Sequence, residues 1–454
     1  RIVPALVAGP LLLAPPVAAQ AFPGDSAIRA MVLPWIEQGR IAGVVVGLTE
    51  NGRQRIIAAG RRGVPGSPAP DARTVFEIGS ATKVFTGIVL GDMVERGEVA
   101  LEDPVAKYLP PGTKVPSRGG REITLLDLAT HTSGLPRLPS NLRPADGANP
   151  YADYTPALLY EFLAAHTLGR DPGASYEYSN LGMGFLGHAL WRRAGRDLES
   201  LYQERILRPL GLRDTRIRLT PELEARLAQG HDASLAPAGK WDMPTLAGAG
   251  ALSSTAADML RFLEANLNGA PGTLGRAMAA AREPRRPAGG PMQIGLGWHI
   301  LQTGTRRIVW HNGGTGGYHS FVGFDPDGRR GVVILINTAA SLDELGFHLL
   351  DPSRPYAPPR PWPATVALTP AQLDALTGEY QLAPGFSITV IREGDQAFAQ
   401  ATGQPRFPIF ADSDSTFYLR VVEARLTFRR DSTGRVGGLV LHQGGRDLPG
   451  RRVP

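Results

Sequence analysis

A serine and a lysine three residues apart are the first pair in this sequence that could do chemistry together. They lie in residues 77–83, with the sequence EIGSATK. Apolar residues cover most of the circumference of the helix predicted over residues 81–96, and positions i and i+3 share a helix face. The Lys83 amine is therefore expected beside the Ser80 hydroxyl. A buried amine that is neutral part of the time can take the serine proton, so we interpret Ser80 as a nucleophile and Lys83 as its activating base.

A purely structural role is the alternative for the same pair. Ser80 could cap the helix, and Lys83 could be a solvated residue of its first turn. Against this, a lysine on a helix that is apolar nearly all round has no easy route to water. The motif alone leaves both interpretations open.

Two later segments carry further candidates. Tyr178 and Asn180 lie two residues apart in the loop SYEYSN before a predicted helix, where Tyr178 could shuttle protons and Asn180 could offer an amide to a substrate carbonyl. A phenol near a protonated lysine is expected to have a lowered pKa. The alternative is a polar loop that caps the next helix.

The third segment, residues 310–318 (WHNGGTGGY), follows a predicted strand. Its glycines would let a substrate lie close to the backbone, and the Gly314 amide could pair with that of Ser80 as an oxyanion hole. His311 would add a polar, partly cationic group. A glycine-rich hairpin turn is the alternative, but it gives no reason for His311.

The predicted strands and helices must bring these three segments together in space. Residues 41–60 contain two β-rich runs joined by Asn51-Gly52, a strong hairpin signal. Helical patterns dominate residues 124–267, β patterns return over residues 295–337, and a last helix is expected at residues 341–350. We predict an α+β fold (an α/β sandwich) in which an antiparallel sheet is flanked by helices, with an all-helical lobe beside it.

The chain is expected to contain four parts. Residues 1–21 resemble a secretory signal that ends in the small-x-small sequence Ala19-Gln20-Ala21. Residues 22–350 hold the three motifs, and residues 351–366 are a proline-rich linker. Residues 367–454 alternate short β runs with turns, which predicts a small all-β barrel-like domain. The protein is therefore expected to be secreted, with the periplasm as its compartment and no stable membrane span.

Composition excludes several classes of function. The 454 residues are 43% hydrophobic and 20% charged, carry a net charge of +6 and include no cysteine. The absence of cysteine excludes disulfides and a thiolate nucleophile. Arginines are scattered without a basic run, so no nucleic-acid partner is expected. His299, His311 and His319 lack zinc spacing, and the glycine run at residues 182–187 follows a loop rather than a strand, so we expect no metal and no cofactor.

The three segments, in this order and spacing, resemble the motifs of the serine β-lactamase and penicillin-binding-protein superfamily. Tyrosine at the head of the middle motif, together with residues 125–136 (LLDLATHTSGLP), is similar to the branch of class C β-lactamases, D-Ala-D-Ala carboxypeptidases and family VIII esterases. The similarity covers about residues 25–350. The C-terminal part is similar to lipocalin-like domains attached to some of these hydrolases.

This resemblance implies a role for each matched residue. Ser80 would be acylated, Lys83 would activate it, and Tyr178 would assist deprotonation or protonate the leaving nitrogen. Asn180 would orient the substrate amide, and the Ser80 and Gly314 amides would hold the oxyanion. The substrate-binding residues would be Asn180, His311, Asn312, Gly313, Gly314 and Thr315. His311 departs from the lysine of class C enzymes, which puts the anchoring of a substrate carboxylate in question.

We therefore predict a serine hydrolase that forms an acyl-enzyme with β-lactams or D-Ala-type peptides. Two alternatives stay open: a carboxylesterase of the same fold, and a penicillin-binding protein with slow turnover. The expected partner is a small acyl substrate, which could be a β-lactam, a D-amino-acid peptide or an ester. The sequence does not decide the oligomeric state, or whether Lys83 or Tyr178 is the main base.

Overall fold

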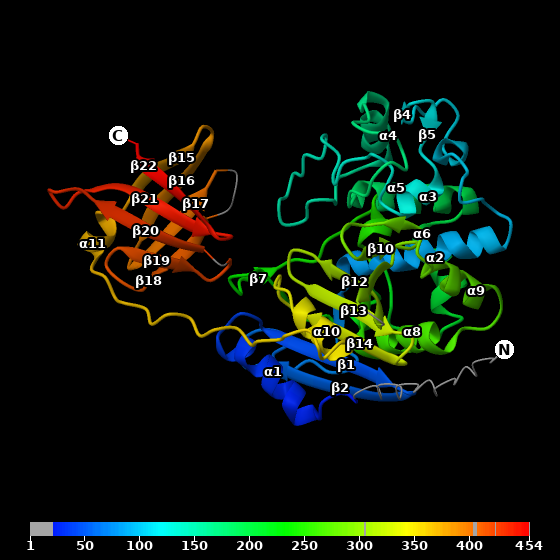
Figure 1. Cartoon of the computed structure of the whole chain (residues 1–454), viewed down its shortest axis with the longest axis horizontal. Coiled ribbons are helices and arrows are strands. Elements are labelled where there is room, and N and C mark those ends of the chain that lie inside the picture. Colours follow the sequence, from blue (N-terminus) through cyan, green and yellow to red (C-terminus); the bar gives the residue numbers. More distant parts are fainter. Residues whose placement is uncertain (1–20, 304–305, 403–405, 423, 454) are drawn as a thin grey trace, which may run out of the picture.

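The computed structural model describes residues 21–303, 306–402, 406–422 and 424–453 (Figure 1). Apart from its last residue, the predicted signal lies outside these ranges. In the described part of the chain, no helix is long and apolar enough to cross a membrane. A sheet with its surrounding helices forms one part of the molecule and a closed barrel forms the other, as Figure 1 shows.

An eight-stranded antiparallel sheet is the base on which the three motifs are placed. Its strands run in the order β2-β1-β14-β13-β12-β11-β10-β9. In this order they are β2 (Arg53–Gly60), β1 (Gly43–Glu50), β14 (Arg330–Ile336), β13 (His319–Asp325), β12 (Arg306–Gly314), β11 (His299–Thr303), β10 (Met292–Ile294) and β9 (Arg286–Pro287). The first hairpin turns at the predicted Asn51-Gly52, and both residues have positive φ.

Helices cover both faces of the sheet, and this explains why its central strands are apolar throughout. On β14 all seven residues are buried, because alternate side chains enter two different cores. One core contains α1 (Asp25–Glu37) and α10 (Asp343–Leu350). The other contains α2 (Thr82–Glu95), α8 (Ala256–Asn268) and α9 (Gly272–Ala281). The predicted α+β sandwich is confirmed.

The segment between β3 (Val75–Glu77) and β8 (Ser253–Thr255), which pair with each other, contains most of the helical lobe. Its helices beyond α2 are α3 (Leu125–Ala129), α4 (Pro156–Ala165), α5 (Asn180–Ala194), α6 (Leu198–Tyr202) and α7 (Pro221–Glu224). Two short pairs complete it: β4 (Ser117–Arg118) with β5 (Arg121–Glu122), and β6 (Gly230–His231) with β7 (Pro237–Ala238). Alpha5 is buried along most of its length, and its glycines allow close packing: a Cβ at Gly187 would lie 2.9 Å from the Gly248 Cα.

The C-terminal strands form a closed antiparallel barrel. They are β15 (Gly378–Ala383), β16 (Phe386–Glu393), β17 (Gln396–Ala401), β18 (Arg406–Ala411), β19 (Thr416–Leu419), β20 (Ala424–Arg430), β21 (Val436–Gln443) and β22 (Arg446–Arg452). The short helix α11 (Pro370–Asp374) precedes them. The short β runs expected within residues 367–454 correspond to the seven strands from β15 to β21. The eighth, β22, has the sequence RDLPGRR and lacks an apolar alternation, but pairing with β15 and β21 closes the barrel.

Candidate active site

Ser80 lies on a short 3₁₀ turn, Gly79–Ala81, between β3 and α2. This turn is fixed from two sides: the Ile78 amide donates to the Leu252 carbonyl at 3.0 Å, and the Ser320 hydroxyl donates to the Ile78 carbonyl at 2.7 Å. Glycine permits the close approach of β12. A Cβ on Gly79, whose φ is +49°, would lie 2.8 Å from the Gly314 nitrogen. The Ser80 side chain thus emerges beside the third motif.

Lys83 is completely buried, one turn into α2, and its amine has three close neighbours. Its Nζ lies 2.8 Å from the Ser80 Oγ, 2.9 Å from the Asn180 Oδ1 and 2.6 Å from the Ala249 carbonyl oxygen. A carbonyl oxygen only accepts hydrogen bonds. A neutral amine can give its two N–H bonds to Asn180 and Ala249, which leaves its lone pair for the Ser80 hydroxyl.

The surroundings of Lys83 favour this neutral form. Burial holds the Lys83 pKa well below its usual 10.5, and the nearby positive charge of Arg137 lowers it further. No carboxylate contributes to its shift. The helix therefore carries a base that is free of its proton closer to neutral pH than an exposed lysine would be.

Tyr178 lies two residues before the start of α5, beside the Ser80 side chain. Ser179 caps this helix through a 2.8 Å bond from the Gly182 amide, and its own amide donates to the His131 Nδ1 at 3.1 Å. The Lys83 Nζ lies 4.9 Å from the centre of the Tyr178 ring. Burial raises the pKa of Tyr178, and a hydrogen bond with Ser80 offsets this only in part. The expected lowering of the phenol pKa is therefore wrong, because the lysine beside it is itself desolvated.

His311 lies on β12, deeper than the sequence suggests. It is fully buried, with its Nδ1 beside the Asn312 carbonyl oxygen at 2.5 Å and no partner for Nε2 among the residues that the structure describes. Burial holds its pKa well below 6.5, and the neighbouring His299 and Lys83 lower it further. The expectation of a partly cationic His311 is wrong: the ring is neutral near pH 7, because a charge there would be desolvated among other potential cations.

The remaining residues of the third motif alternate along β12. The Asn312 side chain points to the opposite face of the sheet and donates to Asp343 on α10 at 2.6 Å, away from Ser80. Its predicted role in substrate binding can therefore involve only its backbone. Gly313 packs against the Ser80 turn, since a Cβ there would lie 2.0 Å from the Ile78 carbonyl oxygen. Thr315, just after the strand, is buried beside Glu77.

One edge of β12 is free beside Ser80. Beta11 pairs with β12 only as far as His299↔Trp310, whereas β13 continues to pair up to Gly314. Residues 311–314 therefore have a strand partner on one side only within the described part of the chain. A substrate backbone could lie along this edge, with its carbonyl near the Ser80 and Gly314 amides.

Comparisons with known proteins show which family the chain belongs to. The model of the beta-lactamase family matches residues 20–349. The chain belongs to this family. It is 31% identical over 305 residues to the D-alanyl-D-alanine-carboxypeptidase/endopeptidase AmpH of Escherichia coli K12, covering 63% of this chain and 77% of the relative. A beta-lactamase of the same strain is 30% identical over 350 residues, covering 68% and 88%.

A solved class C beta-lactamase has a similar fold, with a TM-score of 0.64 at 22% identity over 72% of this chain and 95% of that structure. Residues 363–452 match a separate family, described as a domain of unknown function (DUF3471). The two parts of the chain thus match two different family models. As a member of the beta-lactamase family, the protein is a serine hydrolase, as predicted.

Within this beta-lactamase-family site, sequence reasoning missed Arg137. Its guanidinium carbon lies 5.2 Å from the centre of the Tyr178 ring. The side chain is exposed, and among the described residues it has no carboxylate partner. Its charge acts on Lys83 and on Tyr151, which shares a hydrogen bond with Asn180. The only signal in the sequence was its position directly after the HTSGLP run.

Two more histidines surround Tyr178. Its ring centre lies 4.5 Å from that of His131 and 6.2 Å from that of His299. Burial lowers the His299 pKa to about 4, and its Nε2 is 2.9 Å from the Tyr176 hydroxyl. In the part of the chain described here, no group of three or more histidines and acidic residues is arranged to hold a metal ion. The rings of His131 and His299 are instead uncharged neighbours of the Tyr178 phenol.

Glu77, three residues before Ser80, was not identified as a special residue. It is only 4% exposed, and its Oε1 accepts a 2.8 Å hydrogen bond from the Trp241 amide. Within the described ranges, the Oε2 atom has no hydrogen-bond partner. Burial raises the Glu77 pKa to about 7, although the Thr315 hydroxyl and the Trp241 amide act in the opposite direction. Glu77 therefore connects the strand just before the Ser80 turn to the loop that contains Trp241.

Proposed function

We propose that this protein cleaves acyl substrates through an acyl-enzyme on Ser80, and that its substrates are D-Ala-type peptides or β-lactams. The geometry around Lys83 carries the proposal. Its amine is buried, has a strongly lowered pKa and lies 2.8 Å from the Ser80 Oγ, while two carbonyl oxygens accept its N–H bonds. That arrangement suits a general base and has no evident use in a plain helix cap.

In the proposed acylation step, the Ser80 hydroxyl gives its proton to Lys83 as Oγ bonds to the substrate carbonyl carbon. The carbonyl oxygen takes the negative charge and is held by the Ser80 and Gly314 amides. When the C–N bond breaks, Tyr178 gives its proton to the leaving nitrogen and regains one from the Lys83 ammonium. Because the Tyr178 pKa is raised, this phenol is protonated near pH 7 and suits an acid better than a base.

Deacylation requires a water molecule to attack the acyl carbon. The water gives its proton to the same Lys83–Tyr178 pair, and Ser80 leaves with a proton returned from it. Lys83 is thus proposed as the main base and Tyr178 as the proton relay. This assignment rests on the opposite directions of their pKa shifts.

Arg137 supports a substrate that carries a carboxylate. His311 is neutral and Lys83 is needed as a base, so neither offers a fixed positive charge to a substrate. The exposed Arg137 guanidinium beside Tyr178 does. Both D-Ala-terminated peptides and β-lactams carry a carboxylate near the bond that is cleaved, and guanidinium binds a carboxylate in a bidentate manner.

A carboxylesterase is the second candidate, and the neutral His311 favours it. Because the third motif then offers no positive charge, the substrate needs no acidic group. If esters are the substrates, a p-nitrophenyl ester should be turned over while a chromogenic cephalosporin and a D-Ala-D-Ala peptide remain intact.

Mass spectrometry of the intact protein tests the proposal. After mixing with a β-lactam, the mass should rise by that of one intact lactam molecule, because ring opening releases no leaving group, and the adduct should be absent in Ser80→Ala. Rapid loss of the adduct indicates a hydrolase, whereas an adduct that persists for hours indicates a slow penicillin-binding protein. The absence of both an adduct and turnover with a lactam, a peptide and an ester would refute the acyl-enzyme mechanism.

A further inference from the structure

The barrel is filled at one end and hollow at the other. At the filled end, the Tyr380 hydroxyl donates to the Leu376 carbonyl beside α11 at 2.7 Å. The Phe428 ring packs against Tyr380 and Phe417, with centres 5.7 and 5.4 Å apart. These aromatic side chains and Leu373 close this end. The other end lacks such a plug among the described residues.

The hollow end contains an apolar cavity of about 240 Å³. Short side chains leave room for this cavity. Three alternate positions of β17 are alanines, Ala397, Ala399 and Ala401, and the last two line the cavity. Larger apolar residues complete the lining, namely Phe386, Ile388, Phe407, Leu426 and Leu441. The lining contains no charged residue, and Gln443 is its one polar member in the described part of the chain.

A cavity of this kind is suited to an apolar ligand. Its volume is roughly eight times the ~30 Å³ that a water molecule occupies in the liquid, but water there would find few polar partners. Its rim is apolar as well: Val422 is 41% exposed, and Ala233 from the loop between β6 and β7 lies at the same opening. Figure 1 shows β7 projecting toward the barrel.

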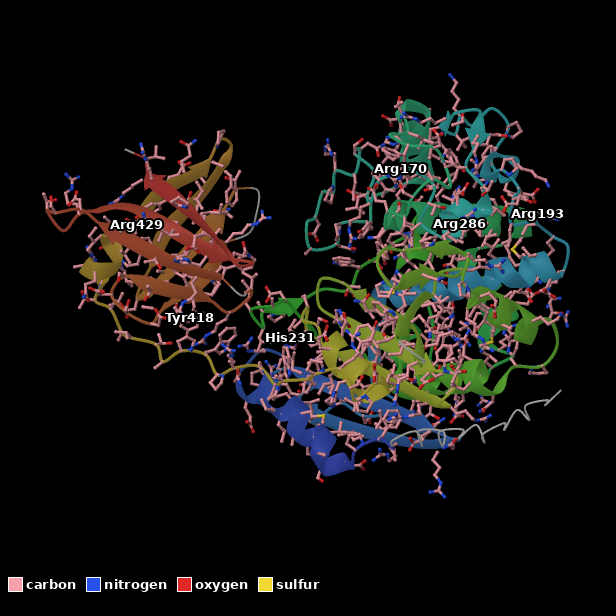
Figure 2. All side chains as sticks on the ribbon, in the orientation of Figure 1. Arg170, Arg193, His231, Arg286, Tyr418 and Arg429 are labelled. Atoms are coloured by element: carbon pink, nitrogen blue, oxygen red, sulfur yellow. The ribbon has the colours of Figure 1, made fainter. Side chains whose placement is uncertain are left out.

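A cationic hollow adjoins this opening. It shares Leu419, Val422, Ala424 and Gln443 with the lining of the barrel cavity. Its charged members are the arginines Arg40, Arg360, Arg425 and Arg446 and the acid Asp447, and the ring of His442 also lines it. Figure 2 shows Tyr418, which also lines this hollow, on the side of the barrel nearest the linker.

The positive charge of this hollow is only partly neutralised. Asp447 lies 2.7 Å from His442, and Arg425 pairs with Asp412. Arg360 and Arg446 are exposed and have no carboxylate partner within the described ranges. An anionic group at the barrel opening would find two free guanidinium groups there.

We propose that the barrel binds a single-chain aliphatic carboxylate, with the chain in the apolar cavity and the carboxylate in the arginine-lined hollow. The uncharged lining excludes a charged head from the interior, because a buried unpaired charge is costly. The hollow outside favours an anion over a cation. A ligand that is apolar at one end and anionic at the other satisfies both regions at once.

Isothermal titration of the full chain with octanoate tests this proposal. Octyltrimethylammonium has the same chain with a cationic head, and acetate has the same head without the chain. We expect saturable binding of octanoate, at least tenfold weaker binding of octyltrimethylammonium, and no detectable binding of acetate. Absence of octanoate binding, or equal binding of all three ions, would overturn the proposal.

Substitutions locate the two ends of the ligand. Ala399→Leu fills the cavity and should abolish octanoate binding, while Ala383→Leu, the same change at an exposed position of β15, should leave it unchanged. Arg360→Gln combined with Arg446→Gln should weaken octanoate binding at least tenfold without affecting a neutral octyl alcohol. Unchanged octanoate binding in Ala399→Leu, or in the double arginine variant, would contradict the proposed placement of the ligand.

Folding of each variant is checked by its circular dichroism and melting temperature. If Ala399→Leu does not fold, Ala424→Leu places a larger side chain at the cavity lining in another strand and should give the same loss. Octanoate should also raise the melting temperature of the wild-type barrel and not that of the filled variant. A rise of the same size in both would count against binding in the cavity.

Discussion

At the scale of single residues, the site depends on how Lys83 is kept neutral. Lys83→Met keeps the length and apolar stem of the side chain and removes the amine, so α2 should remain packed. We expect acylation by a β-lactam or ester to fall by about 10²–10⁴-fold, as is typical when a general base is removed. Stopped-flow or intact-mass kinetics measure this. Lys114→Met, at an exposed position, is the matched control; a Lys83→Met protein with normal acylation would refute the role of the amine.

The pH dependence of acylation follows from the same residue. Because its pKa is lowered, Lys83 loses its proton at a lower pH than an exposed lysine, and the neutral form is the active one. The rate constant for acylation should therefore rise with pH through the Lys83 pKa and level off well below pH 10.5. A rate constant that continues to rise up to the usual lysine pKa would show that the amine is not desolvated in solution.

Arg137 is the residue expected to distinguish acidic from neutral substrates. Arg137→Gln should raise KM about tenfold or more for a peptide that ends in a free carboxylate, because it removes a charge-assisted hydrogen bond. The value of kcat should change little, and the amidated peptide should be unaffected. Steady-state kinetics on the two peptides measure the difference. Arg208→Gln, an exposed arginine elsewhere, is the control; an equal effect on both peptides would contradict a role in binding the carboxylate.

At the scale of elements, the close contact between the Ser80 turn and β12 sets the geometry of the proposed oxyanion hole. Gly313→Ala would place a Cβ 2.0 Å from the Ile78 carbonyl oxygen and 2.7 Å from the Ser80 nitrogen, so the two segments must separate. A displacement of about 1 Å can cost roughly 10²-fold in rate, and we expect a loss of that order in kcat. Gly147→Ala, with no atom within 4 Å of the added carbon, should be silent.

The contact between β3 and the Trp241 loop should give the fold a pH dependence. Glu77 has a pKa of about 7 in the fold against 4.5 in the open chain, so the folded state holds more protons between these pH values. Its contribution is fully present below pH 4.5 and is lost as pH rises to about 7, which lowers the free energy of unfolding by about 3 kcal/mol. Denaturant unfolding of wild type and Glu77→Gln at pH 4.5 and 8 measures it.

The glutamine variant should lack this slope, since its amide oxygen can still accept the Trp241 N–H and carries no charge. Glu161→Gln, at an exposed position of α4, should retain the wild-type slope. An identical slope in wild type and Glu77→Gln would show that this carboxyl is solvated.

Sequence reasoning reached the elements whose patterns are local. The spacing of Ser80 and Lys83, the Asn51-Gly52 hairpin and the repeated helical periods each contain their own signal. Strand β22, with the sequence RDLPGRR, does not, because it is held by its neighbours in the barrel rather than by its own apolar side chains. The charges of buried side chains could not be predicted for the same reason. Segments distant in the sequence bury His311 and keep it neutral, and they raise the Tyr178 pKa. No single stretch of sequence encodes that burial.

At the scale of the whole molecule, the linker attaches the barrel to the hydrolase part through Trp362. The Arg40 guanidinium carbon lies 3.6 Å from the Trp362 ring centre, and the Trp362 Nε1 donates to the Gln38 carbonyl at 2.9 Å. On its other side the ring stacks on Tyr418 of the barrel, with centres 5.8 Å apart. One indole therefore contacts both the end of α1 and the barrel.

Trp362→Ala should release the barrel without disturbing either fold. The linker before it stays attached, because Gln38 and Arg40 donate to the Pro359 and Arg360 carbonyls at 2.9 Å each. We expect a larger radius of gyration by small-angle X-ray scattering and separate melting transitions for the two parts, with unchanged ester turnover, since no contact with the Ser80 site is lost. Trp362→Phe keeps the stacking and should fall between wild type and Trp362→Ala. An unchanged scattering curve for Trp362→Ala would mean that other contacts hold the barrel in place.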